Sequence, residues 1–514
     1  MFSGFAVIRL DILPTNFNIK LTFYECVCVC GATVTRTRLF SSRQAVSWFR
    51  NLHHDWPQRR NDPQLVMAQE RKEKFLTTEL VNKIIESNDD LNGYRLVSDS
   101  DCVLTTPQGL DGFMSVIHRL TLNLTHTTTG ATRCLTVMVK VMKGDDGFRK
   151  KSLGLVLFPN EINVYSAVIP AFERLIRNAN AKIDLHTLCP RIYVAETGVT
   201  YPSYSDQEET FLVMEDVSAR GFVPGPRLNL DKPHLTLMAR KVAQFHACSY
   251  ALRIGGQSEM LSDLVKRIIP LNFVQDGKIF FESYDIVFKV VFERLFAYFD
   301  EKPELLKSDS IRDRVQTLRR QYGTTPSELM QRCLERDDVY SVILHGDYNR
   351  NNVLFRYDAD APQDVMLIDF QENRYGSPGL DLSFFMYMNM PPEDWANGGW
   401  EYLLTVYHQE LIRCVCDILK LQPDDPALQA YSFDAMQQHL KQHFIYGAII
   451  AIKFLPCMLA NEQEVEEIVH HFHKDVTADA FRQIYLTAGG EIVNDRISRV
   501  MVHAAQQGYL DMIM

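Results

Sequence analysis

The stretch Val342-Ile-Leu-His-Gly-Asp-Tyr-Asn-Arg-Asn-Asn-Val-Leu-Phe355 decides the fold. It reads as an apolar strand, a polar loop and a second strand, and Val365-Met-Leu-Ile-Asp-Phe-Gln371 follows as a further apolar strand. Phosphoryl transfer needs a carboxylate that orients a substrate hydroxyl, and an amide and another carboxylate that hold magnesium on nucleotide phosphates. The spacing therefore predicts a kinase-like site, with Asp347 at the hydroxyl and Asn352 and Asp369 as the metal ligands. The alternative is a hairpin whose Asp and Asn side chains only satisfy turn backbones.

Length, composition and charge limit the class of protein. With 514 residues, the chain can bury a large core and predicts two or more domains or lobes. Hydrophobic residues make up 46% and charged residues 23%, which is typical of globular proteins. The formal net charge of -10 gives no reason to expect nucleic acid binding and fits poorly with adsorption to an anionic membrane.

No segment reads as a membrane span or a secretory signal. The best apolar run, Tyr446–Leu459, is shorter than the roughly 18 residues of a span and carries Lys453 and Pro456. The N-terminal apolar stretch is broken by Arg9 and Asp11. Eleven cysteines are too few for a disulfide scaffold of this length. A cytoplasmic protein without a membrane span is therefore expected.

The chain divides unevenly into three predicted parts. Residues 1–66 show no sustained helical or strand period and predict a poorly ordered extension. Residues 67–217 predict a sheet lobe, and residues 218–514 predict a helical lobe with the catalytic loop and the acceptor site. Strands are expected at residues 94–98, 115–124, 134–141, 191–195 and 210–215, and helices at 68–87 and 158–176. This order indicates a small sheet with one packed helix.

The sheet lobe offers a pair of charged residues for the nucleotide phosphates. Lys140 closes an apolar strand, and Glu161 lies near the start of the following helix. A lysine placed in this way contacts phosphates while the glutamate fixes its position. Lys143 is the rival for the lysine role, but it falls after the strand. Ordinary surface charge is the plain alternative for both residues.

Two further segments are placed in the nucleotide site by their order along the chain. Gly109 and Gly112 would let a turn approach the phosphates closely, and Ser115 would donate to them, although a plain hairpin turn fits equally. The strand that ends at Glu215-Asp-Val217, before the Gly- and Pro-rich residues 221–226, is expected to be the hinge between lobes. Backbone groups of Glu215, Asp216 and Val217 would bind the adenine edge.

With these motifs in place, the chain resembles the ecdysteroid kinase-like family, also called CHK kinase-like, within the choline and aminoglycoside kinase group. The resemblance covers residues from about 90 to about 460. It rests on Val139-Lys140, Pro159-Asn-Glu161, Leu212-Val-Met-Glu-Asp-Val217, Ala243-Gln-Phe-His-Ala247, His345-Gly-Asp347 with Asn352, Ile368-Asp-Phe-Gln371 and Arg374-Tyr-Gly-Ser-Pro-Gly-Leu-Asp-Leu382. It implies an α+β, two-lobed protein-kinase-like fold, with a small antiparallel-sheet N-lobe, one packed helix and a large, mainly helical C-lobe.

The resemblance also implies ATP-dependent phosphorylation of a hydroxyl on a small molecule, with ATP and Mg2+ as cofactors. It implies Asp347 as the catalytic base, Asn352 and Asp369 as magnesium ligands, and structural roles for His246 and Asp381. Asp381 would hold the catalytic loop, and capping of the helix that begins at Leu382 is compatible with that role. Two departures from the family pattern, Tyr348-Asn349 in the catalytic loop and Asp111-Gly-Phe113 in the turn, leave substrate placement open.

The class of acceptor is less specified. An aromatic-rich stretch between hinge and catalytic loop suits a hydrophobic alcohol, ecdysteroid-like or xenobiotic, although aromatics at helical spacing are usually core. It comprises Phe273, Phe280, Phe281, Tyr284, Phe288, Phe292, Phe296, Tyr298 and Phe299. A choline- or ethanolamine-type kinase and a catalytically weak or inactive protein that binds a hydrophobic ligand stay open. A protein kinase is disfavoured because no Ala-Pro-Glu segment follows Asp369. The sequence does not specify the acceptor, the turnover, the oligomeric state or the role of residues 1–66.

Overall fold

The computed structural model describes residues 6–11, 20–29, 32–39, 71–106, 115–184 and 187–514. They divide into two compact units, Met1–Leu76 and Thr77–Met514. In the first unit, β1 (Ala6–Asp11), β2 (Lys20–Val29) and β3 (Ala32–Leu39) form an antiparallel sheet in that order. The prediction of a poorly ordered extension is wrong for these strands, which are rich in β-branched and aromatic residues that favour pairing. The rest of residues 1–66 lies outside the described residues, where the prediction stands untested.

An antiparallel sheet forms the first lobe of the second unit. Its strand order is β4–β6–β7–β9–β8, and β5 also pairs with β6. Alternate residues of β7, such as Val137, Val139 and Val141, are buried on one face, as the alternating pattern predicts. The short β5 was not predicted. The bounds are β4 (Tyr94–Leu96), β5 (Cys102–Thr105), β6 (Ser115–His126), β7 (Thr132–Met142), β8 (Ile192–Thr200) and β9 (Glu208–Glu215).

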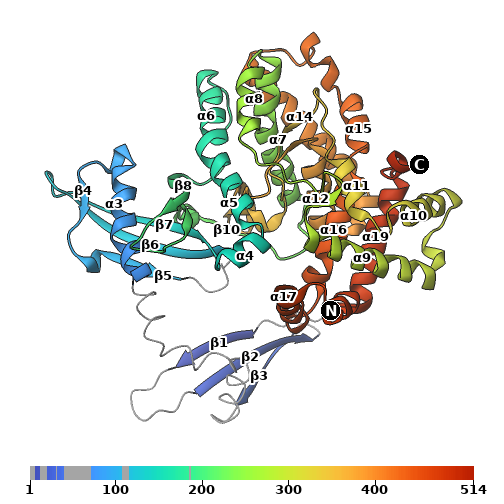
Figure 1. The fold of residues 1–514 in the computed structure, drawn as a ribbon, viewed down its shortest axis with the longest axis horizontal. Helices are drawn as coiled ribbons and strands as arrows, with labels where there is room; N and C mark the ends of the chain where they lie inside the picture. The colour runs from blue at the N-terminus through green and yellow to red at the C-terminus, as the bar shows by residue number, and fades with distance from the viewer. Residues whose placement is uncertain (1–5, 12–19, 30–31, 40–70, 107–114, 185–186) are drawn as a thin grey trace. The chain divides into compact units, whose positions relative to one another are not determined.

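One long helical segment packs against this sheet. It consists of α5 (Gly154–Asn163), the π-helical turn η3 (Val164–Val168) and α6 (Ile169–Asn178), and α5 contacts β8 and β9. Two shorter helices, α3 (Glu79–Glu86) and α4 (Asp146–Lys151), belong to the same lobe. The predicted small sheet with one packed helix is confirmed, and Figure 1 shows it beside the helical lobe.

Short strands carry the motif that decides the fold. β13 (Val342–Ile343) pairs with β16 (Tyr375–Gly376), which joins the segments on both sides of the catalytic residues. β14 (Val353–Asp358) lies between β15 (Ala361–Leu367) and β10 (Phe222–Pro224). The strand that follows the predicted hinge is therefore tied directly to the strand that follows the catalytic loop.

Helices build the rest of the second unit, as predicted. α7 (Lys232–Ile254) packs along α14 (Gly399–Leu419), and α12 (Gly379–Asn389) packs on α16 (Ile445–Leu459). α16 also contacts α9 (Glu282–Glu301) and α19 (Gly490–Gln506), and Figure 1 shows these helices grouped together. The others are α8 (Ser258–Lys266), α10 (Asp309–Tyr322), α11 (Pro326–Cys333), α13 (Pro392–Ala396), α15 (Phe433–Lys441), α17 (Glu462–Asp475) and α18 (Asp479–Thr487).

Among the described residues, one helical run has the length and apolar composition of a membrane span. It is Gly154–Asn178, the segment that carries Glu161, and 61% of its most apolar window is buried inside the protein. A bent pair, Pro426–Lys441 and Ile445–Leu459, passes the same test only when counted as one span. Buried core helices of soluble proteins have the same composition.

Candidate active site

Lys140 lies at the centre of the predicted phosphate site. Its ammonium is 2.8 Å from Glu161 Oε2 and 2.9 Å from Asp369 Oδ1. Lys140 and Glu161 are both buried, whereas the rival Lys143 is exposed. β7, α5 and the segment after β15 thus bring together three residues that the sequence analysis selected separately.

The charges in this cluster influence one another strongly. Burial alone would lower the pKa of Lys140, but the nearby carboxylates of Asp369 and Glu161 outweigh it and raise the pKa. Burial raises the pKa of Glu161, against the opposing effect of Lys140. Asp369 has a φ of +63°, the left-handed region that a non-glycine residue adopts only where its surroundings hold it. The ion pair with Lys140 is one such restraint.

Asp347 and Asn352 meet in the catalytic loop. Asn352 Nδ2 donates to Asp347 Oδ2 at 2.7 Å and to the Asp347 carbonyl oxygen at 2.8 Å. Asn349 Nδ2 donates to the other carboxylate oxygen, Oδ1, at 2.9 Å. Each oxygen keeps a second lone pair with which it can accept a further hydrogen bond. The amide of Asn349, at a position where the sequence departs from the family pattern, was not predicted to contact Asp347.

The Asp347 carboxyl group has an unusual acidity. Burial raises its pKa to about 7, and the charges of Glu372 and Asp369 act in the same direction. The hydrogen bond from Asn352 opposes the shift. A pKa close to neutral is what a general base needs to be both ionised and proton-accepting.

Asp381 holds the backbone of the catalytic loop. Its carboxylate accepts hydrogen bonds from His345 N at 2.7 Å and Gly346 N at 2.9 Å. His246 Nε2 donates to the same group at 3.1 Å. Burial alone would raise the pKa of Asp381, but the hydrogen bond and charge of His246 outweigh it and lower the pKa. Asp381 lies inside the first turn of α12, which Pro378 caps, so the expected capping role is wrong.

Gly346 is required by the geometry of this loop. Its φ is +90°, and a Cβ atom added to it would lie 1.7 Å from the carbonyl oxygen of Glu372. Only glycine combines that backbone conformation with so close an approach.

The hinge residues make side-chain contacts within the sheet lobe and its border. Glu215 pairs with Arg220 at 3.1 Å, and Asp216 pairs with Arg119 at 2.9 Å. Val217 is buried against Phe222 and Met366. These side chains therefore have partners within the protein, and the adenine contact expected of their backbone groups stays a prediction. Ser115 is buried at the start of β6, and Gly109 and Gly112 lie outside the described residues.

The described residues fit a magnesium ion bound with phosphates. Among them, no three His, Cys, Asp or Glu residues gather as a self-sufficient metal site. Magnesium commonly takes one or two carboxylates and completes its coordination with water and substrate phosphates. Asp369 supplies a partly exposed carboxylate, and Asn352 has an amide oxygen left over, because its nitrogen donates to Asp347.

Glu372 and Tyr284 extend the site beyond the predicted residues. Tyr284 of α9 donates from its hydroxyl to Glu372 Oε1 at 3.0 Å. Tyr284 also lines a cavity of about 100 Å³. The cavity is mostly apolar and is lined by Phe148, Ser152, Leu153, Leu157, Phe281, Ser283, Tyr284, Phe472, His473 and Val476. Most of the aromatic stretch is core, whereas Phe281 and Tyr284 reach this cavity.

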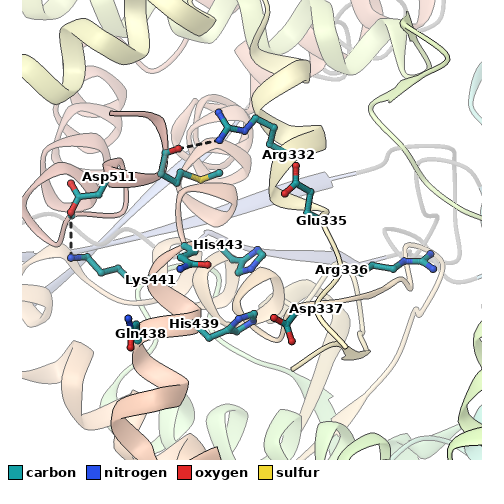
Figure 2. Close-up of a pocket in the computed structure, with 12 residues that line it drawn as sticks. Arg332, Glu335, Arg336, Asp337, Gln438, His439, Lys441, His443 and Asp511 are labelled. Atoms are coloured by element: carbon teal, nitrogen blue, oxygen red, sulfur yellow. Dashed lines mark hydrogen bonds and ion pairs between the residues drawn. The ribbon is translucent and has the colours of Figure 1, made fainter. Parts of the chain in front are cut away.

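A larger cavity, of about 580 Å³, has a different character. Charged side chains of both signs line it, including Arg332, Glu335, Asp337 and Lys441 (Figure 2). None of the predicted site residues lines it. The dashed lines in Figure 2 mark the ion pair of Lys441 with Asp511 at 3.4 Å and the hydrogen bond from Arg332 to the backbone carbonyl oxygen of Met512 at 3.1 Å. This lining does not suit a hydrophobic alcohol.

One protein family matches more than half of the chain. The sequence profile of the ecdysteroid kinase-like family matches residues 109–420. No curated protein sequence matches the chain. Similar solved structures include the GDP complex of wild-type aminoglycoside 2'-phosphotransferase-IIIa, which is 12% identical in sequence to this chain. The match covers 82% of this chain and 98% of that enzyme, with a TM-score of 0.33. The GDP and kanamycin complex of an APH(2'') enzyme has 11% identity, 81% and 98% coverage, and a TM-score of 0.34. Because this family profile matches more than half of the chain, the chain belongs to the ecdysteroid kinase-like family, whose members are small-molecule phosphotransferases of the kinase-like fold.

Proposed function

We propose that this chain transfers the γ-phosphate of ATP to a hydroxyl of a hydrophobic alcohol, ecdysteroid-like or xenobiotic. The observation that carries the proposal is the ammonium of Lys140, bonded to both Glu161 and Asp369. It joins the sheet lobe to the segment after the catalytic loop. Such a cluster serves phosphate binding because a fixed cation faces the place where negative charge gathers.

Asp347 is the base in this proposal. Its carboxylate accepts a hydrogen bond from the acceptor hydroxyl and takes the proton late in the transfer. The amides of Asn349 and Asn352 fix the carboxylate, so that little reorganisation is needed when the hydroxyl arrives. The raised pKa of Asp347, about 7, matches this role near neutral pH.

ATP bound with magnesium would supply the phosphoryl group and the metal charge that balances its oxygens. Asn352 and Asp369 are the residues that would hold the metal ion. Lys140 would then bind phosphate oxygens, and Glu161 would keep it in place. The backbone of Glu215, Asp216 and Val217 would take the adenine, since their side chains have other partners.

The apolar cavity beside Tyr284 supports a hydrophobic acceptor. Its volume of about 100 Å³ is below the ~300 Å³ at which drug-sized ligand sites begin. The cavity in this state therefore takes only part of a steroid-sized molecule. Phe148 of α4 and Phe472 of α17 line the cavity, and Phe148 stacks on His473 of α17, so a separation of these two helices would enlarge it.

Detection of a phosphorylated product tests the proposal. The purified chain is incubated with ATP, magnesium and a panel of hydrophobic alcohols, and products are identified by mass. An increase of one phosphoryl group on an alcohol, dependent on magnesium, is the expected result. Choline and ethanolamine in the same panel test the amine-kinase alternative.

A binding protein without turnover is the second candidate. Stabilisation against heat distinguishes it, because a ligand that binds the folded state raises the melting temperature. The proposal expects a rise with ATP and magnesium together. A rise with hydrophobic alcohols alone, and none with nucleotide, would favour the binding protein.

A further inference from the structure

Lys453 is a buried lysine whose ammonium has no polar partner in the part of the chain that the structure describes. It lies on α16, and 5% of its surface is exposed. Among the described residues, no hydrogen-bond acceptor or ion-pair partner contacts its ammonium. The nitrogen instead lies 3.1 Å from the ring centroid of Tyr284 and 4.2 Å from that of Phe454. Its direct contacts are therefore aromatic faces.

Packing alone does not account for this lysine. Aromatic faces attract a cation, but they replace only part of the hydration that burial removes. Burial disfavours the charged ammonium and lowers the pKa of Lys453 to about 8. A methionine would fill the same space without a charge. A buried lysine that makes no polar contact in the protein is well placed to make one with a ligand.

Tyr284 links Lys453 to the apolar cavity and to Glu372, near the catalytic loop. The charges of Glu372 and Asp347 both act on it, in that order of strength. Tyr284, whose ring covers the ammonium, donates to Glu372 and lines the cavity. α9, which carries Tyr284, contacts α16, which carries Lys453, and Figure 1 shows these two helices near each other. A molecule that offers its hydroxyl to Asp347 and its apolar part to the cavity would pass next to Lys453.

The surrounding charges restrict what Lys453 can bind. Charges of both signs already act on Lys453: the carboxylates of Glu372 and Asp347, and the guanidinium of Arg374, which lies 3.7 Å from Glu372. A further cation would be repelled by the ammonium and would find the Tyr284 face already taken. An added carboxylate or phosphate would leave an uncompensated negative charge in a buried place. A neutral oxygen acceptor fits both limits.

We propose that Lys453 donates a hydrogen bond to a second, uncharged oxygen of the acceptor, such as a ring ketone, while Asp347 receives its hydroxyl. This inference rests on the proposed function for the position of the hydroxyl. It narrows the substrate class to hydrophobic alcohols that carry a carbonyl or another neutral oxygen acceptor. It also excludes quaternary amines and polycationic sugars as good substrates.

Matched pairs of acceptors test the inference. Hydroxysteroids with and without a ring ketone are compared for kcat/KM and for binding by thermal shift. We expect the wild-type chain to prefer the keto-alcohol by about tenfold or more, because a buried donor left unpaired penalises the analogue without the oxygen. In Lys453→Met, kcat/KM and binding should fall for the keto-alcohol and stay unchanged for the alcohol without the ketone, so the preference disappears. Lys453→Gln, which keeps a neutral donor, recovers part of it.

Lys241→Met is the control for the loss of a buried lysine. Lys241 is buried to the same extent, but it has partners in Thr187 at 2.9 Å and Asp364 at 3.3 Å. Its substitution should leave the ratio between the two acceptors unchanged.

Separate outcomes identify which proposal fails. If the ratio of kcat/KM between the two acceptors is the same in wild type and in Lys453→Met, the subsite is refuted. If in addition kcat/KM falls equally for both acceptors, the ammonium would act on the phosphoryl group instead. If no alcohol is phosphorylated, yet thermal shifts still favour the keto-alcohol in wild type only, the subsite stands and the proposed transfer falls. If neither turnover nor binding distinguishes the pair, the subsite is refuted.

Discussion

The Lys140 ammonium lies 2.9 Å from Asp369 Oδ1, although the two residues come from different lobes. The same ammonium contacts Glu161 at 2.8 Å, so a single cation pairs with two carboxylates. Glu161 Oε1 is buried and has no hydrogen-bond partner in the described part of the chain. The stability of the site therefore depends on this lysine, and so does the phosphate binding that we propose for it.

Replacing Lys140 by methionine should weaken both the fold and nucleotide binding. The change leaves Glu161 buried without a cation, and breaking a buried pair in this way costs about 3 kcal/mol. Urea unfolding measures the first effect, and titration with ATP and magnesium measures the second. Lys143→Met is the control, because Lys143 is exposed and should change neither result. Unchanged ATP affinity in Lys140→Met would contradict the phosphate role.

Replacement of Asn352 and replacement of its neighbour Asn351 should have very different effects on kcat. Asn352 donates twice to Asp347, whereas the side chain of Asn351 is exposed. Asn352→Ala should lower kcat by about 100-fold or more, because both the carboxylate and the metal site lose a fixed group. Asn351→Ala should stay within about twofold of wild type. Equal kcat values for the two variants would refute the role given to Asn352.

Gly346→Ala should prevent the catalytic loop from forming. The new Cβ would lie 1.7 Å from the backbone carbonyl oxygen of Glu372, which follows Asp369 by three residues. A loss of more than about 3 kcal/mol in the free energy of unfolding is expected from the clash and the strained φ together. Gly256→Ala separates the two effects, because Gly256 has a φ of +74° with open space around it. That variant should lose about 1 kcal/mol, from strain alone.

The pH dependence of stability should reveal the buried Lys453. Its pKa falls from 10.5 to about 8 on folding, chiefly through burial, so between these values the unfolded chain binds more protons. Lys453 therefore destabilises the fold fully below pH 8, and the penalty fades as the pH rises towards 10.5. Lys453→Met should be more stable than wild type by about 3 kcal/mol at pH 7, and the difference should vanish near pH 10.5. A variant less stable than wild type at pH 7 would contradict this assignment.

Much of the site could be predicted from sequence because its residues lie in local patterns. Asp347, Asn352 and Asp369 are set by one loop and the strand behind it, and Lys140 and Glu161 by the order of strand and helix. The sheet lobe follows from alternating apolar residues, as in β7.

The rest depends on contacts between distant segments. Glu372 joins the site through Tyr284, and Asn349 reaches Asp347 only through the bend of the loop. Lys453 gave a signal, as the one charged residue within the apolar helix α16, but nothing in the sequence says which aromatic faces cover it. The strands within residues 1–66 were missed because no sustained strand period marks them in the sequence.

The central claim is that Asp347 is the base that receives the acceptor hydroxyl, and Asp347→Asn tests it most directly. Asparagine keeps the shape of the side chain but cannot take the proton. The measurement is the rate of formation of phosphorylated alcohol at saturating ATP and magnesium, with Asp358→Asn as the exposed control on β14. The account predicts that Asp347→Asn lowers this rate by about 1,000-fold or more, with the melting temperature and ATP binding retained. Wild-type turnover in the purified Asp347→Asn variant would contradict it.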